Sequence, residues 1–319
     1  MNKDELNQPE HGRISTFLEV EQIGVNHFRS KFLWVPLRAR GVYGGSVIIS
    51  QALVSATNCV DPSFAVHNGQ CYFLLSSSAS TPIEYSVERL RDGKSYLTCS
   101  VTASQKGKKI FSMLCSFQKP EIWQPNFQWP MPDVPPPDQC DDEEVRYSRV
   151  IDHPHSNAEL VKYFKQRLVE RKRSPIAIKM AKAHHVNKDG TVRYMYWMKA
   201  RDIPHYEAPY QKYILAYISD LHFISSASRI LGMKRGGKGS EALSMTSTLD
   251  HSIWFYDNNF DAGDWLLYEM DCPRGGSGRG IVHGRIFTHC GTLIAVCSQE
   301  GVIRANVRDP AKPEAPAKL

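Results

Sequence analysis

The sequence predicts an α+β protein made of two diverged copies of one unit, in which a β-sheet wraps a central helix. Three observations carry this prediction. Each half begins with a short aromatic segment and continues with one apolar helical run. About four alternating segments separated by turn signals then follow in each half, as expected of antiparallel strands. A proline-rich stretch, which holds seven of the 19 prolines between Pro120 and Pro137, separates the two halves.

The first half contains the aromatic segment, then the helix, then the remaining strands. The apolar run from Val47 to Ala56 predicts the central helix. Turn signals at Asp92-Gly93 and at Lys106-Gly107-Lys108 predict hairpins between the strands that flank them. We expect strands at residues 32–40, 67–75, 84–90, 96–105 and 110–118.

The second half repeats this order. An aromatic strand is expected from Tyr194 to Arg201, and the apolar run from Tyr213 to Ile224 predicts one central helix. Turn signals at Arg274-Gly275-Gly276 and at Cys290-Gly291 separate the strands that follow. We expect these strands at residues 250–256, 266–270, 281–288 and 293–303.

Two pairs of segments support the duplication. Residues 67–75 resemble residues 250–256, and residues 84–90 resemble residues 266–270. One apolar helix followed by antiparallel strands is the hotdog arrangement, so the prediction is a double hotdog. The predicted division is an N-terminal hotdog domain, a Pro-rich linker or strap, a C-terminal hotdog domain with an inserted helical segment, and a disordered tail. These parts correspond to residues 1–119, 120–145, 146–308 and 309–319.

The inserted segment, residues 157–183, is basic and partly amphipathic, and Ser174-Pro175 interrupts it. Charge runs on helices usually face water, so a solvated face is favoured over a binding site. The sequence assigns no function to this segment.

Length, composition and charge indicate an ordinary globular protein. A chain of 319 residues corresponds to about two domains, and 42% hydrophobic with 23% charged residues is close to globular averages. The net charge of +6 is too small, and the basic residues are too scattered, to indicate binding to nucleic acid. No apolar run approaches the roughly 18 residues that a membrane-spanning helix needs, and the first residues show no secretion signal.

The eight cysteines contain no CxxC pair and no Cys/His spacing typical of zinc, so the sequence indicates no metal site. Most of them lie inside apolar runs, which favours buried free thiols in a reducing compartment. A chain of this length needs neither a disulfide nor a structural metal to hold its core.

The last three residues, Ala317, Lys318 and Leu319, form a small-basic-leucine tripeptide of the Ser-Lys-Leu type. When such a tripeptide is free at the end of a chain, the peroxisomal import receptor reads it as an address. The Pro- and Ala-rich stretch from Asp309 to Pro316 would keep it exposed. The expected location is therefore the peroxisomal matrix, the alternative being a tail without a signal.

Several common catalytic motifs are absent from the sequence. The run from Gly275 to Gly278 is followed by Arg279, so it is not the GxSxG turn of an α/β-hydrolase. No Walker A or GxGxxG phosphate-binding loop occurs either. The glycine-rich stretch from Gly275 to Gly280 predicts a hairpin turn, with anion binding through Arg274 or Arg279 as the less favoured alternative.

Spaced segments in both halves carry a resemblance to a known family. Examples are AYISDLHF at residues 216–223, STLDHSIWF at 247–255 and SQEGVIR at 298–304, together with HNGQCYF at 67–73. They resemble the hallmark segments of the acyl-CoA thioesterase II family, and the match covers roughly residues 19–304. The resemblance implies a double hotdog that hydrolyses fatty acyl-CoA to free acid and CoA without a cofactor. It also implies a homodimer or larger oligomer.

The resemblance also implies the catalytic residues. In that family a water molecule hydrolyses the thioester, held by an Asp on the second central helix, a Ser or Thr on a strand, and a Gln on the last strand. By position these are Asp220, Thr248 and Gln299. Asp220 can accept a proton as general base, Thr248 can fix the water, and Gln299 can hydrogen-bond as charge builds. An Asp inside an apolar run is costly to bury without a partner, which favours a functional role.

Other polar residues have supporting interpretations. Asp250 and His251 are neighbours on a strand, so their side chains point to opposite faces, and we interpret them as structural or supporting residues. The phosphates of CoA require cationic partners. The candidates are Arg91, Lys94, Arg274 and Arg279.

Two other functions stay open. A double-hotdog enoyl-CoA hydratase would need an Asp/His pair facing one substrate, but Asp220 and His222 lie two apart on the predicted helix and diverge by about 200°. A non-catalytic acyl-CoA binding protein on the same fold would more easily accommodate apolar residues at the three buried polar positions. Release of free thiol from acyl-CoA distinguishes the thioesterase from both.

Overall fold

The computed structural model describes residues 13–33, 44–186, 191–233 and 241–307. In the first half, the predicted central helix is present. Val47, Ile49 and Leu53 in it are fully buried, as expected of a mainly apolar helix that the sheet wraps. Most of the strand predicted at residues 32–40 lies outside the described residues, and Phe32 is not in a strand. The elements are α1 (Ile14–Leu18), β1 (Val20–Gly24), β2 (His27–Ser30), α2 (Gly44–Thr57), β3 (Ala65–Phe73), β4 (Glu84–Asp92), β5 (Tyr96–Gln105) and β6 (Lys108–Gln118).

The second half has two helices where the sequence predicts one. The helix predicted from Tyr213 to Ile224 ends at Ser219, and a second helix begins at Phe223. The elements are β7 (Ile176–Val186), β8 (Val192–Ala200), α5 (Ala208–Ser219), α6 (Phe223–Ile230), β9 (Leu243–Thr248), β10 (Asp250–Phe255), β11 (Leu266–Gly276), β12 (Arg279–Phe287) and β13 (Leu293–Ala305).

The prediction of a single second helix was wrong because the break leaves no mark on the apolar pattern. His222 has φ = 60°, in the left-handed region, and this residue separates α5 from α6. Apolar residues continue on both sides of it, at Leu221 and Phe223. α6 then packs closely on the sheet, where a Cβ on Gly301 would lie 2.6 Å from the Ile224 side chain. A chain that continued straight through His222 could not make this contact.

Two further segments differ from their prediction. Residues 176–183, predicted as part of a helical insertion, belong to β7, because α4 (Ala158–Arg173) ends just before Pro175, and alternate residues Ile176 and Ile178 then enter the core. Arg274 to Gly276, predicted as a turn, continue β11. The turn is Ser277-Gly278, where φ values of 50° and 73° suit a two-residue hairpin.

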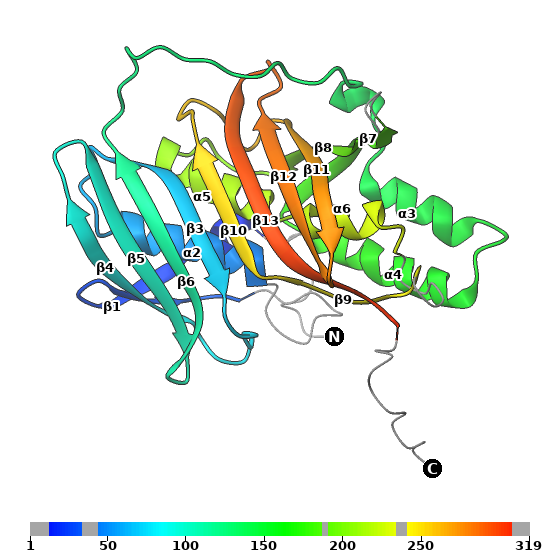
Figure 1. The fold of residues 1–319 in the computed structure, drawn as a ribbon, viewed down its shortest axis with the longest axis horizontal. Helices are drawn as coiled ribbons and strands as arrows, with labels where there is room; N and C mark the ends of the chain where they lie inside the picture. The colour runs from blue at the N-terminus through cyan, green and yellow to red at the C-terminus, as the bar shows by residue number, and fades with distance from the viewer. Residues whose placement is uncertain (1–12, 34–43, 187–190, 234–240, 308–319) are drawn as a thin grey trace, which may run out of the picture.

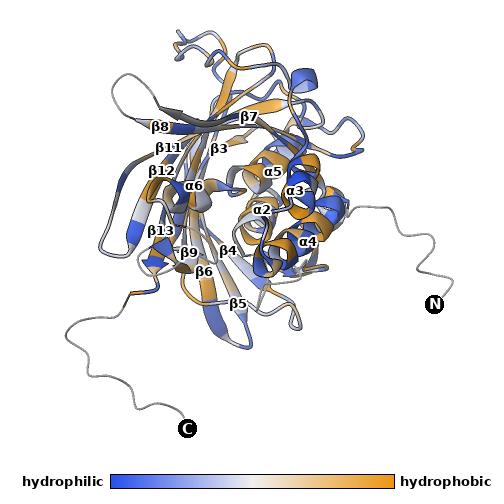
Figure 2. Ribbon diagram, turned by 90° about the vertical axis from the view of Figure 1, so that its right-hand side faces the viewer, coloured by the Kyte–Doolittle hydropathy of each residue, from blue (hydrophilic) through white to orange (hydrophobic). Residues whose placement is uncertain are grey.

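One antiparallel sheet joins both halves. Its strands follow the order β1-β2-β4-β5-β6-β3-β10-β13-β12-β11-β8-β7, and β9 pairs with β13. The pairing of β3 with β10 places His251 opposite Cys71 and connects the two units. Figure 1 shows α2 and α5 behind the curved sheet, and in Figure 2 the strands form one layer and these helices the other. The predicted α+β double hotdog is confirmed.

The proline-rich segment is a strap that runs along the top edge of the sheet in Figure 1, and its Met131 and Val134 pack against a cluster that includes Trp197 and Phe287. Trp197 Nε1 donates to the Pro135 carbonyl at 2.9 Å, and the Arg285 guanidinium lies 5.0 Å from the Trp129 ring. The strap continues through a 3₁₀ turn at Pro137–Gln139 into a helical hairpin, α3 (Glu143–Asp152) and α4. Within the described ranges, no helix is both long and apolar enough to cross a membrane.

Candidate active site

The three residues implied by the family resemblance come together at one point of the fold. Asp220 follows the last residue of α5, Thr248 ends β9, and Gln299 lies in the middle of β13. The Gln299 amide donates through Nε2 to Thr248 Oγ1 at 2.8 Å, and it also hydrogen-bonds the Asp220 carboxylate. Gln299 is fully buried, whereas Asp220 and Thr248 keep partial exposure. These side chains therefore form a polar cluster at the border of the apolar core.

The first unit completes this cluster through the beginning of α2. The Ser46 hydroxyl lies 3.3 Å from Asp220 Oδ2, and the Ser46 backbone N–H also donates to this carboxylate. A Cβ on Gly45 would lie 2.0 Å from Asp220 Oδ2, so only glycine leaves room for the carboxylate here. An anion at a helix N-terminus is stabilised by the helix dipole. Ser46 could not be identified from the sequence, because 174 residues separate it from Asp220.

His251 supports the cluster from behind. One ring nitrogen, Nδ1, lies 2.7 Å from Gln299 Oε1, and the other, Nε2, lies 2.9 Å from Ser219 Oγ. The residue is 1% exposed. Because His251 occupies the amide oxygen of Gln299, the amide N–H groups face Thr248 and Asp220. Asp250 instead accepts from the Glu300 backbone N–H at 3.0 Å, away from this cluster.

Burial sets the protonation of the Asp220–His251 pair. Burial raises the pKa of Asp220, although the nearby His251 and the hydrogen bonds from Ser46 and Gln299 oppose this rise. Burial lowers the pKa of His251, which keeps its imidazole neutral at neutral pH. A carboxylate with a raised pKa is a better proton acceptor than an ordinary aspartate, as a general base requires.

The candidate partners for CoA phosphates lie at two different places. Arg274 and Arg279 flank the turn between β11 and β12, and Arg279 pairs with Val302, about 10 Å along β13 from Gln299. Arg91 and Lys94 lie at the end of β4 and in the turn after it, and β4 is four strands away from β10, roughly 20 Å. Of the four candidates, only Arg274 and Arg279 lie near Gln299 along the sheet, and the Arg279 guanidinium already donates to Glu300 at 3.0 Å on the face of the sheet opposite to Gln299. The tripeptide Ala317–Leu319 lies outside the described residues.

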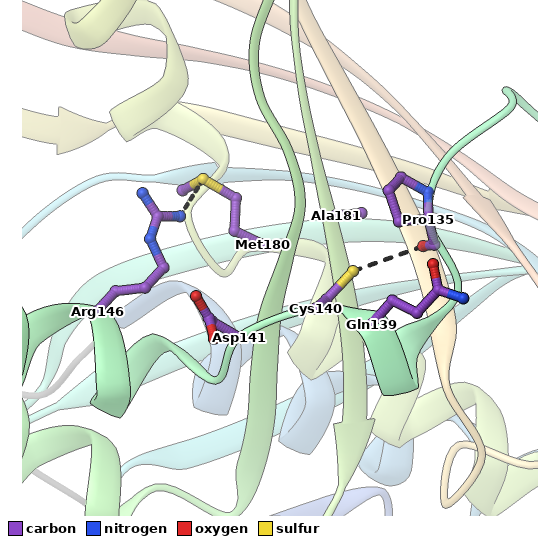
Figure 3. A pocket seen from close by; sticks show the side chains of 7 residues that line it. All are labelled: Pro135, Gln139, Cys140, Asp141, Arg146, Met180 and Ala181. Carbon is purple, nitrogen blue, oxygen red and sulfur yellow. Dashed lines mark hydrogen bonds between the residues drawn. The ribbon is translucent and has the colours of Figure 1, made fainter.

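A separate pocket lies between the strap and β7 (Figure 3). Its lining includes Cys140, Asp141 and Arg146, and the Cys140 thiol points toward the Pro135 carbonyl, 3.5 Å away. It contains none of the residues of the polar cluster. In the part of the chain that the structure describes, no group of three or more His, Cys, Asp or Glu side chains could hold a metal ion.

Both halves of the chain match families of known domains. Residues 137–303 match a family described as the acyl-CoA thioesterase C-terminal domain. Residues 34–118 match one described as the acyl-CoA thioesterase N-terminal domain. The two matches follow the two hotdog units and leave the strap largely between them.

Whole proteins of similar length also match. Acyl-coenzyme A thioesterase 8 of Rattus norvegicus is 34% identical over 298 residues, covering 92% of this chain and 90% of the relative. The peroxisomal acyl-coenzyme A thioester hydrolase 1 of Saccharomyces cerevisiae is 22% identical, covering 93% of this chain and 96% of the relative. The crystal structure of an acyl-CoA thioesterase II, TesB2, from Mycobacterium marinum aligns with a TM-score of 0.72 at 30% identity, covering 94% of this chain and 99% of that one.

Proposed function

This chain belongs to the acyl-CoA thioesterase family, and from that premise we propose that it hydrolyses fatty acyl-CoA thioesters through a water molecule activated by Asp220, Thr248 and Gln299. The observation that carries the proposal is the hydrogen bonding of the Gln299 amide, which links Thr248 Oγ1 at 2.8 Å and the Asp220 carboxylate. Thr248 Oγ1 accepts from Gln299 and so keeps its own hydroxyl proton for a water molecule, while Asp220 can accept the proton of that water.

The chemistry needs one base and one site for negative charge. Asp220 takes a proton from the water while the water oxygen bonds to the carbonyl carbon of the thioester. The π electrons of the carbonyl group move to the carbonyl oxygen, which becomes the oxyanion. When the tetrahedral intermediate collapses, the C–S bond breaks and the CoA sulfur receives the proton from Asp220. The first turn of α2 begins beside Asp220, and backbone N–H groups there that lack intrahelical partners would stabilise the oxyanion. No acyl-enzyme forms on this route.

A double-hotdog hydratase would need a histidine that faces the substrate beside Asp220, and two histidines lie near this residue. His222 is not on a helix with Asp220, since it adopts a left-handed conformation between α5 and α6. Its Nε2 lies 3.1 Å from Glu143 Oε1, away from the polar cluster. The other nearby histidine, His251, has both ring nitrogens hydrogen-bonded within the protein. Neither histidine faces a substrate, which favours hydrolysis by water over hydration of a double bond.

Acyl-CoA also requires a partner for its phosphates. We assign this role to the arginines at the β11–β12 turn. Arg274 and Arg279 lie there, and the Arg304 Nε lies 3.8 Å from the position of a Cβ on Gly278 in the same turn. Arginine suits phosphate because its planar guanidinium donates two parallel hydrogen bonds. Arg91 and Lys94, at the end of β4 four strands away from β10, are the less favoured candidates.

The proposed location is the peroxisomal matrix, with import through the receptor that reads Ala317, Lys318 and Leu319. The tripeptide and the name of the yeast relative support this proposal. A fluorescent protein fused ahead of Met1, in a chain ending at Leu319, should accumulate in peroxisomes. Removal of the last three residues should leave the fusion in the cytosol, and unchanged peroxisomal fluorescence would contradict the proposal.

The proposed reaction is tested by free-thiol release from a panel of acyl-CoA esters, from short to very long chains and including branched and bile-acid forms. The parent chain should release thiol, and the Gln299→Ala variant should release it much more slowly. Binding of acyl-CoA without thiol release would favour the non-catalytic binding protein. The oligomeric state, predicted to be a homodimer or larger, is measured on the same preparation by light scattering.

A further inference from the structure

The turn that carries Asp220 also contains a residue in an unfavourable backbone conformation. His222 adopts φ = 60° and ψ = −6° two residues after Asp220. Residues with a Cβ rarely adopt the left-handed region, and they remain there only when their surroundings hold them. The contacts of His222 therefore help to determine where Asp220 points.

Both the ring and the backbone of His222 are fixed. Its Nε2 lies 3.1 Å from Glu143 Oε1 and 3.3 Å from Oε2, and the two side chains are 7% and 4% exposed. The imidazole stacks on Tyr196, with 4.9 Å between ring centroids and an interplanar angle of 19°. The His222 carbonyl accepts from the Ser226 backbone N–H at 3.1 Å and from the Ser225 hydroxyl at 2.6 Å.

Glu143 comes from the helical hairpin that follows the strap. It is the first residue of α3, and Arg171 of α4 lies 3.8 Å from its carboxylate. Burial disfavours a charge here, but His222, Arg171 and Arg167 hold the pKa of Glu143 well below its usual range. Glu143 is thus a buried anion that joins α3, α4 and the α5–α6 turn in one network.

We propose that Glu143 is a positioning residue for the hydrolysis, because it holds His222 in its left-handed conformation and thereby orients the turn so that Asp220 faces Ser46 and Gln299. The inference rests on the proposed role of Asp220. It gives the α3–α4 hairpin a function in the active site, whereas the sequence favoured a solvated face for residues 157–183, which include α4.

The neighbouring residue provides a matched control. Glu144 lies on the same turn of α3, and its Oε1 pairs with Arg201 Nη2 at 2.7 Å, with no contact to His222. Glu143→Ala should lower kcat for acyl-CoA by about 10- to 100-fold with KM within about two-fold, since a small displacement of a catalytic group is costly. Glu144→Ala should lose comparable thermal stability but keep kcat within about two-fold of the parent.

A second pair of variants tests the backbone conformation itself. His222→Gly removes the ring but adopts positive φ freely, so it should retain more activity than His222→Ala. Equal kcat values for Glu143→Ala and Glu144→Ala would overturn the inference, and so would equal kcat values for His222→Gly and His222→Ala. If Glu143→Ala does not fold, the comparison of the two His222 variants tests the inference. A parent chain without thioesterase activity would refute the proposed function, and with it this inference, whereas equal values in an active parent refute the inference alone.

Discussion

Replacing Gly45 by alanine should inactivate the enzyme with little loss of stability. An added Cβ would lie 2.0 Å from Asp220 Oδ2, 2.3 Å from Cγ and 2.6 Å from Oδ1. A normal contact needs roughly 3.4 Å or more, so the carboxylate must move by about 1 to 1.5 Å. A misplacement of about 1 Å can cost 100-fold in rate, and we therefore expect kcat to fall by about 100-fold or more. Alanine favours a helix over glycine by up to about 1 kcal/mol, which offsets the lost packing in part.

The assay is free-thiol release from an acyl-CoA ester, with the thermal unfolding midpoint measured on the same sample. Gly69→Ala serves as the control, because a Cβ there meets its nearest neighbour, Leu53, at an ordinary 3.6 Å. A folded Gly45→Ala variant with the kcat of the parent would refute the reasoning, since Asp220 could then act from another position.

Three further results are expected. Asp220 must be ionised to act as a base, and burial raises its pKa, so kcat should fall on the acid side at a higher pH than for an ordinary aspartate. A kcat profile that stays flat down to about pH 4 would contradict this role of Asp220. Arg274→Ala should raise KM several-fold for acyl-CoA but not for the matching acyl-pantetheine, which lacks the nucleotide phosphates. Lys94→Ala should leave KM unchanged for both substrates. An equal rise of KM for both substrates in Arg274→Ala would exclude the phosphate contact. Trp197→Phe removes the hydrogen bond of 2.9 Å to the Pro135 carbonyl in the strap. The free energy of unfolding should fall by about 1 kcal/mol and the melting temperature by about 2–4 °C, with kcat unchanged. An unaltered melting temperature would show that this contact contributes little to stability.

The sequence predicted the elements whose pattern is local. The apolar run around Val47 to Ala56 could only be buried as a helix, and the glycine at Lys106-Gly107-Lys108 marked the turn between β5 and β6. The break after Ser219 escaped detection because the apolar residues continue through it. A left-handed histidine has no signature in hydrophobic periodicity, since tertiary contacts hold it.

In the candidate site too, some residues could be named from the sequence and others only from the folded structure. Asp220, Thr248 and Gln299 were named through a family resemblance, and their mutual hydrogen bonds agree with a shared site. Ser46 and Glu143 could not be named, because each meets the α5–α6 turn only through the folded arrangement of distant segments. The sequence predicted a structural or supporting role for His251, and its ring nitrogens hydrogen-bond Gln299 and Ser219, as such a role requires.

The central claim is that Asp220 activates the water, and the kcat of the Asp220→Asn variant tests it most directly. Asparagine keeps the shape of the side chain but cannot take a proton, so the variant should fold normally and lose about 100- to 10,000-fold in kcat. A folded Asp220→Asn variant within about ten-fold of the parent kcat would contradict the account, because another group would then have to remove the proton.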